Sequence, residues 1–317
     1  MRALVLIATI SLAGPAVAEQ SQSFDVFGAS VQEAANGVLG ILSFNAVPDT
    51  SAGSIQLDSA TSDNPSVNLI QFGGAFTVAD SFPLYMEGFL GYARYDPQFI
   101  ATEGEQERTI PLKWNNFAAT GGLGWDFSLT DELVLRPIFN VTLGHVTSDL
   151  AGLETLINIT EDTELNFFDE GRLNAYGLGG SLMLDFERVR EAYEFDTELR
   201  YTHLHLQSFG GTSSAVEGNA EAITINLWSR LRWPTGIEVF ERPLRYVVQG
   251  SYSVYRGDQA GALGFDRLTK LGGGLEVDLS KWDIGALGLY VRRTRLLASG
   301  VFGDNVSGYS IGLGVGF

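Results

Sequence analysis

The sequence contains no cysteine, which excludes a disulfide framework, a thiolate metal site and a lipid-modified cysteine behind a leader. Basic residues are scarce, because Lys and Arg number 20 against 38 Asp and Glu, for a formal net charge of −18. Nucleic-acid binding needs a basic surface, so we expect no nucleic-acid partner. Long apolar runs are missing too, which argues against a membrane-spanning helix.

The first residues have the pattern of a secretory signal peptide. Arg2 precedes a short apolar run that ends at Ala13, and Ala16-Val17-Ala18 has the form of a cleavage site. The run is too short to anchor the chain across a bilayer. We therefore expect a signal peptide over residues 1–18, cleaved between Ala18 and Glu19, a short periplasmic or luminal leader over 19–36, and a barrel domain over 37–317.

The last residues of the chain alternate strictly between apolar and small side chains. Because side chains point to opposite faces of a strand with a period of two, this pattern predicts a strand with one apolar face. An apolar face that ends on an aromatic carboxyl-terminal residue is typical of the strand that closes a membrane barrel, and we interpret it as the assembly signal. The apolar face consists of Tyr309, Ile311, Leu313, Val315 and Phe317.

Similar alternation recurs along the chain and predicts about twelve strands of barrel-wall length. The breaks between them alternate between short and long, which is typical of outer-membrane barrels with periplasmic turns and extracellular loops. A soluble β-sandwich also alternates, but it does not account for the signal peptide, the loop rhythm and the terminal strand together. The expected strands are Val38–Ala46, Val67–Val78, Leu84–Tyr95, Phe117–Phe127, Leu133–Leu143, Asn174–Phe186, Tyr193–Tyr201, Ile223–Trp233, Leu244–Val254, Leu271–Leu279, Leu287–Val291 and Ser307–Phe317.

The predicted fold is all-β, an antiparallel up-and-down transmembrane barrel, with the terminal strand pairing back to Val38–Ala46. Ser30 followed by Glu33 resembles a helix start, and Asn36-Gly37 resembles a stop. This segment is either a short helix in the mouth of the barrel or an irregular leader.

The signal peptide, the strand count and the terminal strand Tyr309–Phe317 resemble the translocator barrel of autotransporters. Those domains carry a helix in the pore, which the segment Ser30–Asn36 resembles. The short leader implies a solitary barrel without a passenger. The resemblance implies a location in the outer membrane of a Gram-negative bacterium, recognition by the barrel-assembly machinery, and contact with membrane lipid and lipopolysaccharide.

Charged residues of both signs fall on the predicted inward faces. In a narrow barrel such charges pair across the lumen and form a structural ladder, or they tune the selectivity of a small-solute pore. Both interpretations are non-enzymatic and need no cofactor. The residues are Arg136, Asp185, Glu194, Asp196, Glu198, Arg200, Arg230, Arg232, Arg245, Lys270, Glu276 and Arg292.

An enzymatic alternative depends on His203 and His205, which the alternation places on the outward face. The location resembles that of outer-membrane phospholipase A and the lipid A deacylases, where a histidine activates a serine on the outside of the wall. Here position 205 is His, and Ser208 is predicted to face inward. Two histidines without a third ligand do not predict a metal site.

A third hypothesis is a surface that binds cations or an external partner through acidic loops. Carboxylates crowd two of the long breaks, where divalent cations could bridge them to lipopolysaccharide phosphates. These residues are Glu103, Glu105, Glu107, Asp149, Glu154, Glu161, Asp162, Glu164, Asp169 and Glu170.

Overall fold

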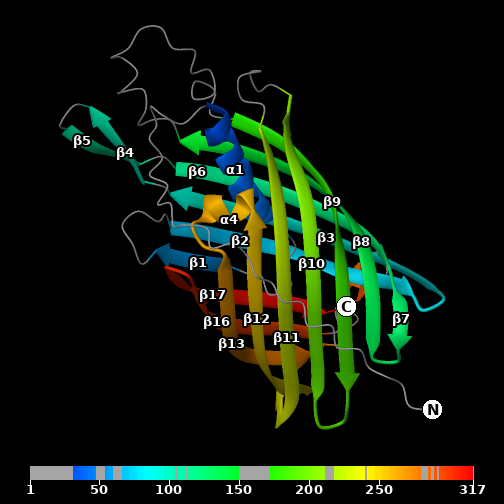
Figure 1. Cartoon of the computed structure of the whole chain (residues 1–317). Coiled ribbons are helices and arrows are strands. Elements are labelled where there is room, and N and C mark those ends of the chain that lie inside the picture. The colour runs from blue at the N-terminus through cyan, green and yellow to red at the C-terminus, as the bar shows by residue number, and fades with distance from the viewer. Residues whose placement is uncertain are drawn as a thin grey trace, which may run out of the picture.

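The computed structural model describes residues 31–47, 54–59, 66–96, 98–103, 106–111, 113–149, 172–210, 218–239, 241–279, 285–286, 289–290 and 293–316. The expected signal peptide, its cleavage site at Ala18 and Glu19, and the terminal Phe317 lie outside these residues. The described segments form an antiparallel barrel with helices inside one end (Figure 1).

The wall is built from β1 (Ser54–Ser59), β2 (Ser66–Ala79), β3 (Phe82–Asp96), β6 (Lys113–Trp125) with its continuation β7 (Phe127–Thr130), β8 (Leu133–Asp149), β9 (Arg172–Val189), β10 (Glu194–Phe209), β11 (Asn219–Val239), β12 (Arg242–Gly257), β13 (Arg267–Asp278), β16 (Arg293–Gly303) and β17 (Val306–Gly316). With β6 and β7 counted as one, these described strands make a closed barrel of 12. β6 pairs with β3 on one side and β8 on the other, and the first wall strand β1 pairs with the last, β17, so the sheet is continuous around the barrel.

The two ends of the barrel differ in their connections. At the short-turn end, residues 80–81, 131–132 and 190–193 join consecutive strands. At the long-loop end, residues 97–112 join β3 to β6 and include the hairpin of β4 (Gln98–Glu103) and β5 (Gln106–Pro111). Residues 150–171 join β8 to β9, and α4 (Asp258–Leu263) lies between β12 and β13. The predicted alternation of short and long connections is confirmed at these positions.

The expected first strand, Val38–Ala46, is wrong, because these residues belong to the helix α1 (Val31–Ala46) inside the barrel (Figure 1). The helix continues through the expected stop at Asn36-Gly37. Leu39 and Ile41 are as buried as Leu42 and Phe44, so this segment is buried on all sides and its alternation of apolar residues does not distinguish a strand from a helix. Burial in the lumen outweighs the weak stop signal.

The first wall strand is instead β1, inside the stretch expected to be a loop. The closing strand β17 is confirmed, but its partner is β1, with Ser54 opposite Ile311 and Ser59 opposite Val306. The alternation in β1 is easy to miss because its apolar residues, Ile55 and Leu57, are buried on the inner face.

The expected strand Leu287–Val291 is also wrong. Residues of that stretch contribute to a separate pairing of β14 (Gly285–Ala286) with β15 (Leu289–Tyr290). The wall strand is β16, which runs through most of the predicted break at Ala298–Asn305 and reaches β17 by a tight turn at 304–305. Arg292, expected in the lumen, lies outside the described residues.

Large apolar side chains cover the outside of the wall, as the alternation predicts. Outward positions include Phe72, Leu90, Leu123 and Leu271, all more than half exposed, whereas their chain neighbours point inward. In the described part of the chain, none of the helices has the length and apolar content needed to cross a membrane. The exposed apolar residues named above lie on strands.

The main apolar core lies within the lumen, in the half nearest the long loops. It is formed by α1, residues of α4 and its flanks, and the inward side chains of the surrounding strands. Phe44 of α1 packs edge-on against Tyr255 and Phe265, with ring centroids 5.5 and 6.1 Å away. A Cβ at Gly40 would lie 2.7 Å from Cβ of Ala262, so glycine permits the close approach of α1 to α4.

Candidate functional site

The lumen is the first candidate site, and an ion pair crosses its middle. Arg200 on β10 donates to both carboxylate oxygens of Glu87 on β3, at 2.8 and 2.6 Å. Tyr85 and Asn140 also donate to Glu87, at 3.0 and 2.7 Å, and Arg200 donates to Ser181 at 2.9 Å. The Glu87 side chain is fully buried. A buried pair is favourable only when its remaining hydrogen-bonding capacity is met, as it is here.

The half of the lumen nearest the short turns holds a larger charge network. Glu194 accepts from Arg245 at 2.7 Å and from Arg293 at 2.6 Å. Asp196 accepts from Arg230 and Arg232, at 2.6 and 2.8 Å. These pairs join neighbouring strands and also strands far apart around the wall, so they fill this half with linked side chains.

Several of the charges predicted for the lumen lie on the inner face of the wall. Arg136 pairs with Asp126 and Asp185, and Glu276 lies 3.5 Å from Arg295. Glu198 and Lys270 also lie on the inner face.

Other members of the network, among them Glu87, Asp126, Arg293 and Arg295, are absent from the predicted set. Glu87 could have been found, because it lies within an expected strand on the face opposite Leu84 and Leu90. Arg293 and Arg295 were missed because the eleventh strand was placed too early in the chain.

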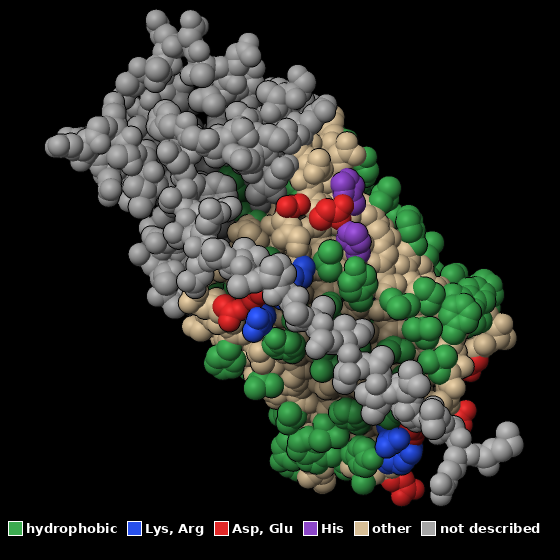
Figure 2. Space-filling view, viewed as in Figure 1, with side chains coloured by type: hydrophobic (Ala, Val, Ile, Leu, Met, Phe, Trp, Pro, Cys, Tyr) green, Lys and Arg blue, Asp and Glu red, His purple; other side chains and the backbone are tan. Residues whose placement is uncertain are grey.

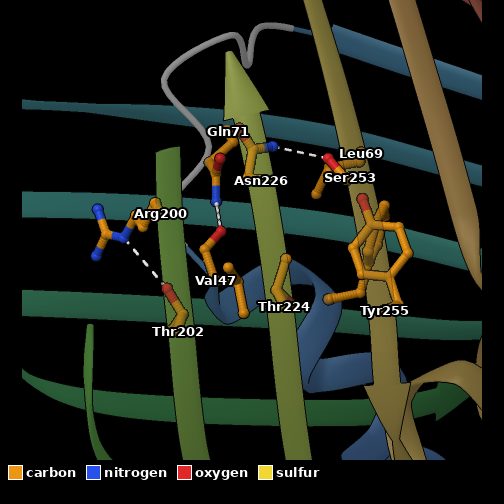
Figure 3. A pocket seen from close by; sticks show the side chains of 10 residues that line it. Val47, Leu69, Gln71, Arg200, Thr202, Thr224, Asn226, Ser253 and Tyr255 are labelled. Carbon is orange, nitrogen blue, oxygen red and sulfur yellow. Dashed lines mark hydrogen bonds between the residues drawn. The ribbon is translucent and has the colours of Figure 1, made fainter. Parts of the chain in front are cut away.

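At the junction between the apolar and charged halves lies a cavity of about 20 Å³ (Figure 3). Its lining includes Phe44, Gln71, Arg200 and Tyr255. Gln71 Nε2 donates to the carbonyl oxygen of Val47 at 3.1 Å, which ties the end of α1 to β2. A cavity of this size holds about one water molecule and no larger solute.

The second candidate lies on the outside of the wall. His203 Nε2 hydrogen-bonds to Oε2 of Glu221, and His205 Nδ1 donates to Oε1 of the same carboxylate at 2.8 Å. All three side chains are about half exposed. Figure 2 shows histidine side chains beside acidic ones on this face, with apolar side chains over much of the wall around them. We call these three residues the His–Glu cluster.

Ser208 does not join this cluster. Its side chain is buried, on the opposite face of β10, and its hydroxyl donates to the carbonyl of Gly218 at 3.2 Å while accepting from the Gly218 amide at 2.8 Å. A serine nucleophile needs a histidine within hydrogen-bond reach, so Ser208 and His203 cannot form a catalytic pair in this arrangement. Among the described residues, no group of three or more His, Asp or Glu side chains could hold a metal ion.

A pair of carboxylates lies at the long-loop end, outside the strands. Asp266 follows α4, and Asp304 lies in the turn between β16 and β17. A hydrogen bond between the two side chains lowers the pKa of Asp266 and raises the pKa of Asp304. Arg256 donates to Asp266 at 2.7 Å, which decides which of the two carboxyls keeps its charge. The acidic side chains expected to bind cations in the two long loops lie outside the described side chains.

Comparison with known proteins finds no matching protein-family model and no matching curated protein. Among solved structures, the β domain of the Bordetella autotransporter BrkA matches with a TM-score of 0.45 and 13% identity, over 82% of this chain and 94% of that one. LpxR from Salmonella typhimurium matches with a TM-score of 0.35 and 10% identity, over 81% and 98%. A mutant ferric enterobactin receptor, PfeA of Pseudomonas aeruginosa, has a TM-score of 0.29 and 10% identity, over 84% of this chain and 42% of the receptor. We draw no functional argument from similarities of this strength.

Proposed function

We propose that this chain is an integral barrel of the Gram-negative outer membrane whose lumen is sealed against solutes. The observation that carries the proposal is the position of α1: Leu39 and Leu42 are completely buried within the barrel, in the half nearest the long loops. Beyond α1, the pair of Glu87 with Arg200 crosses the lumen. The cavity between them has room for about one water molecule. These features favour a structural, non-enzymatic role over an open small-solute pore.

The outer wall supports the membrane location. A row of side chains such as Phe72 and Leu313, both more than two-thirds exposed, would be unfavourable in water but matches a hydrocarbon environment. The helix in the lumen supports an autotransporter-like architecture. We also propose that the β17 face of Tyr309, Ile311 and Leu313 is read by the barrel-assembly machinery, as expected for a closing strand.

Conductance in planar lipid bilayers tests the sealed lumen. We expect the wild-type barrel to give no discrete conductance steps, and a variant lacking residues 31–47 to give them, because α1 no longer fills the long-loop half. Phe72→Ala is a matched control, since it changes an outward side chain and leaves the lumen intact. Steady conductance by the wild type would overturn the sealed-lumen proposal.

The membrane location has a separate test. Heat-modifiable migration on a gel and recovery in the outer-membrane fraction after carbonate extraction should hold for both wild type and control. Recovery in the soluble fraction would contradict the location, whatever the conductance shows.

A further inference from the structure

A row of polar side chains crosses three neighbouring strands on the inner face of the wall. Glu198 of β10 lies directly opposite Trp228 of β11, and Trp228 lies directly opposite Ser251 of β12. Side chains directly opposite each other in antiparallel strands have Cβ atoms about 5 Å apart, so the three are neighbours in the lumen. We call these three residues the inner polar row.

Protein groups leave the hydrogen-bonding capacity of this row unused. Trp228 and Ser251 are 3% and 5% exposed, and within the described part of the chain neither the indole Nε1 nor the hydroxyl Oγ forms a hydrogen bond. The carboxylate of Glu198 likewise has no hydrogen-bond or ion-pair partner among the described residues. Buried polar groups in native proteins are almost always paired with protein or with ordered water, so this row points to a ligand.

The row lies beside the cavity at the junction of the two halves. Two residues farther along the same three strands, Arg200, Asn226 and Ser253 line that cavity of about 20 Å³. Residues two apart on a strand face the same side, so the cavity and the row are adjacent on the inner face. Asn226 Nδ2 donates to Ser253 Oγ at 2.7 Å (Figure 3). These two cavity residues pair with each other, whereas Trp228 and Ser251 do not.

Charge and hydrogen-bonding chemistry decide the class of ligand. Asp185 lies opposite Glu198 on β9, and the guanidinium of Arg230 lies 4.6 Å from the centroid of the Trp228 ring. An ion of either sign would therefore meet a like charge. The indole N–H can only donate and a carboxylate oxygen accepts, so the ligand must accept from one and donate to the other. Water does both and is neutral.

We propose that the inner polar row binds ordered water, which accepts from Trp228 Nε1 and bridges it to Glu198 and Ser251. Three polar partners are the usual number for a buried water molecule. The inference rests on the proposed sealed lumen, because a lumen that is filled above and below the row retains such water. The barrel is then closed to solutes and hydrated at its centre.

Water–protein cross-relaxation in NMR spectra tests the proposal on the full barrel in lipid nanodiscs. The tryptophans carry ¹⁵N, and Trp228→Phe assigns the Trp228 indole signal. We expect the wild-type indole N–H to show a cross-peak to water with the sign of a long-lived bound molecule, which differs from that of freely exchanging solvent. Ser251→Val should abolish this cross-peak, because it removes one partner and fills the space with methyl groups.

Ser229→Val is the matched control. Ser229 follows Trp228 along β11 but lies on the outer face, where its hydroxyl shares a hydrogen bond of 2.7 Å with Thr197. The same substitution there should leave the Trp228 cross-peak unchanged. An equal loss in the control would overturn the assignment, because the effect would not depend on the inward hydroxyl.

The unfolding midpoint of Trp228→Phe in urea gives a second measurement that does not need the Ser251 variant to fold. If water bridges the indole N–H to its neighbours, removing the N–H breaks the bridge and lowers the midpoint. If the N–H is simply unsatisfied, its removal raises the midpoint and overturns the proposal.

Two further results would overturn the water site: no such cross-peak in the wild type, or an unchanged cross-peak in a folded Ser251→Val barrel. Heat-modifiable migration checks folding, and planar-bilayer conductance is measured on the same preparations. A silent barrel without the cross-peak rejects the water site alone. Steady conductance rejects the sealed lumen, and the sign of the cross-peak still reports whether bound water is present.

Discussion

The two halves of the lumen are filled by opposite means. Near the long loops, α1 and α4 pack apolar side chains against inward residues such as Leu204 and Leu206, which are fully buried. Near the short turns, arginines and carboxylates from the strands themselves meet in a network around Glu194 and Asp196. A barrel of this width can thus be closed by an added helix or by its own long side chains.

The two kinds of filling predict different responses to substitution in the two halves of the lumen. Close packing makes the apolar half sensitive to the shape of its side chains, because neighbours relax only partly. In the charged half several partners share each carboxylate, and Arg245 and Arg293 remain 20% and 31% exposed, so the loss of one partner is partly offset by the others and by water. The pair of Glu87 and Arg200 lies between the two halves. It is buried like the side chains of the apolar half, but it is an ion pair like those of the charged half.

The largest effect is expected at this boundary. Arg200→Ala leaves the carboxylate of Glu87 buried without its cation, and should lower the free energy of unfolding by about 3–5 kcal/mol. Urea unfolding in detergent micelles measures the change. The double variant Glu87→Leu with Arg200→Met should recover most of the loss, since it removes both charges at similar volume. A double variant as unstable as the single one would contradict this explanation.

Leu42→Ala probes the apolar half. Leu42 is fully buried against Gly144 of β8, where any Cβ would overlap its side chain. Removing its isobutyl group should destabilise the barrel by about 3 kcal/mol in the same assay, through lost burial and the resulting cavity. Leu313→Ala, at a position 71% exposed on the outer wall, should change stability in micelles by less than about 1 kcal/mol. Equal effects at the two positions would show that α1 does not carry a packed core.

Two glycines of β3 offer a sharper test of shape. A Cβ at Gly91 would overlap Oδ1 of Asn45 on α1, whereas a Cβ at Gly88 would have no neighbour within 4 Å. Gly91→Ala should therefore cost about 2 kcal/mol. Gly88→Ala should be neutral or slightly stabilising, because alanine restricts the unfolded chain more than glycine does. We expect a lower unfolding midpoint for Gly91→Ala than for Gly88→Ala. The reverse order would contradict the close packing of α1 against β3 at Gly91.

The smallest effect is expected outside the strands, at the short-turn end. Hydrogen bonds from Arg188 and Arg190 hold the pKa of Glu132 below its usual value. A carboxyl whose pKa is lowered on folding contributes stability at pH values above its unfolded pKa, and this stability is lost as the pH falls through the folded pKa. Glu132→Gln should therefore be slightly less stable than wild type at pH 7, with the gap vanishing in acid. The unfolding midpoints of the wild type and Glu132→Gln, compared at pH 7 and pH 3, measure this difference. A difference that grows in acid would contradict a lowered pKa of Glu132 in the folded state.

The sequence predicted most of the wall because outward and inward positions differ in chemistry there. On β10, the outward Leu199 and Tyr201 alternate with the inward charged residues Glu198 and Arg200, so the period of two is clear. The same reasoning failed for α1, because Leu39, Ile41, Leu42 and Phe44 are all buried and their spacing fits either period. It also failed for β1, where Ile55 and Leu57 point inward toward the core that α1 completes.

The His–Glu cluster could be predicted only in part. The alternation placed His203 and His205 on the outward face, but Glu221 lies 16 residues from His205 in the chain and reaches it only through the register of β10 with β11. No spacing rule within a single strand identifies that partner. The inward orientation of Ser208, by contrast, followed from the alternation alone and separates it from His203.

The seam between β1 and β17 sets an order of events during assembly. Tyr309 donates to Gln56 across it, joining residues 253 positions apart, whereas the other wall strands pair with partners much closer in sequence. Loop closure over such a separation is the most costly in entropy, so we expect the seam to form last. The sequence between α1 and β1 is short, residues 47–53, so we expect the helix to enter the lumen before the seam closes. The charged half can therefore form hairpin by hairpin as strands are added, while the apolar half becomes complete only when the two ends of the wall meet.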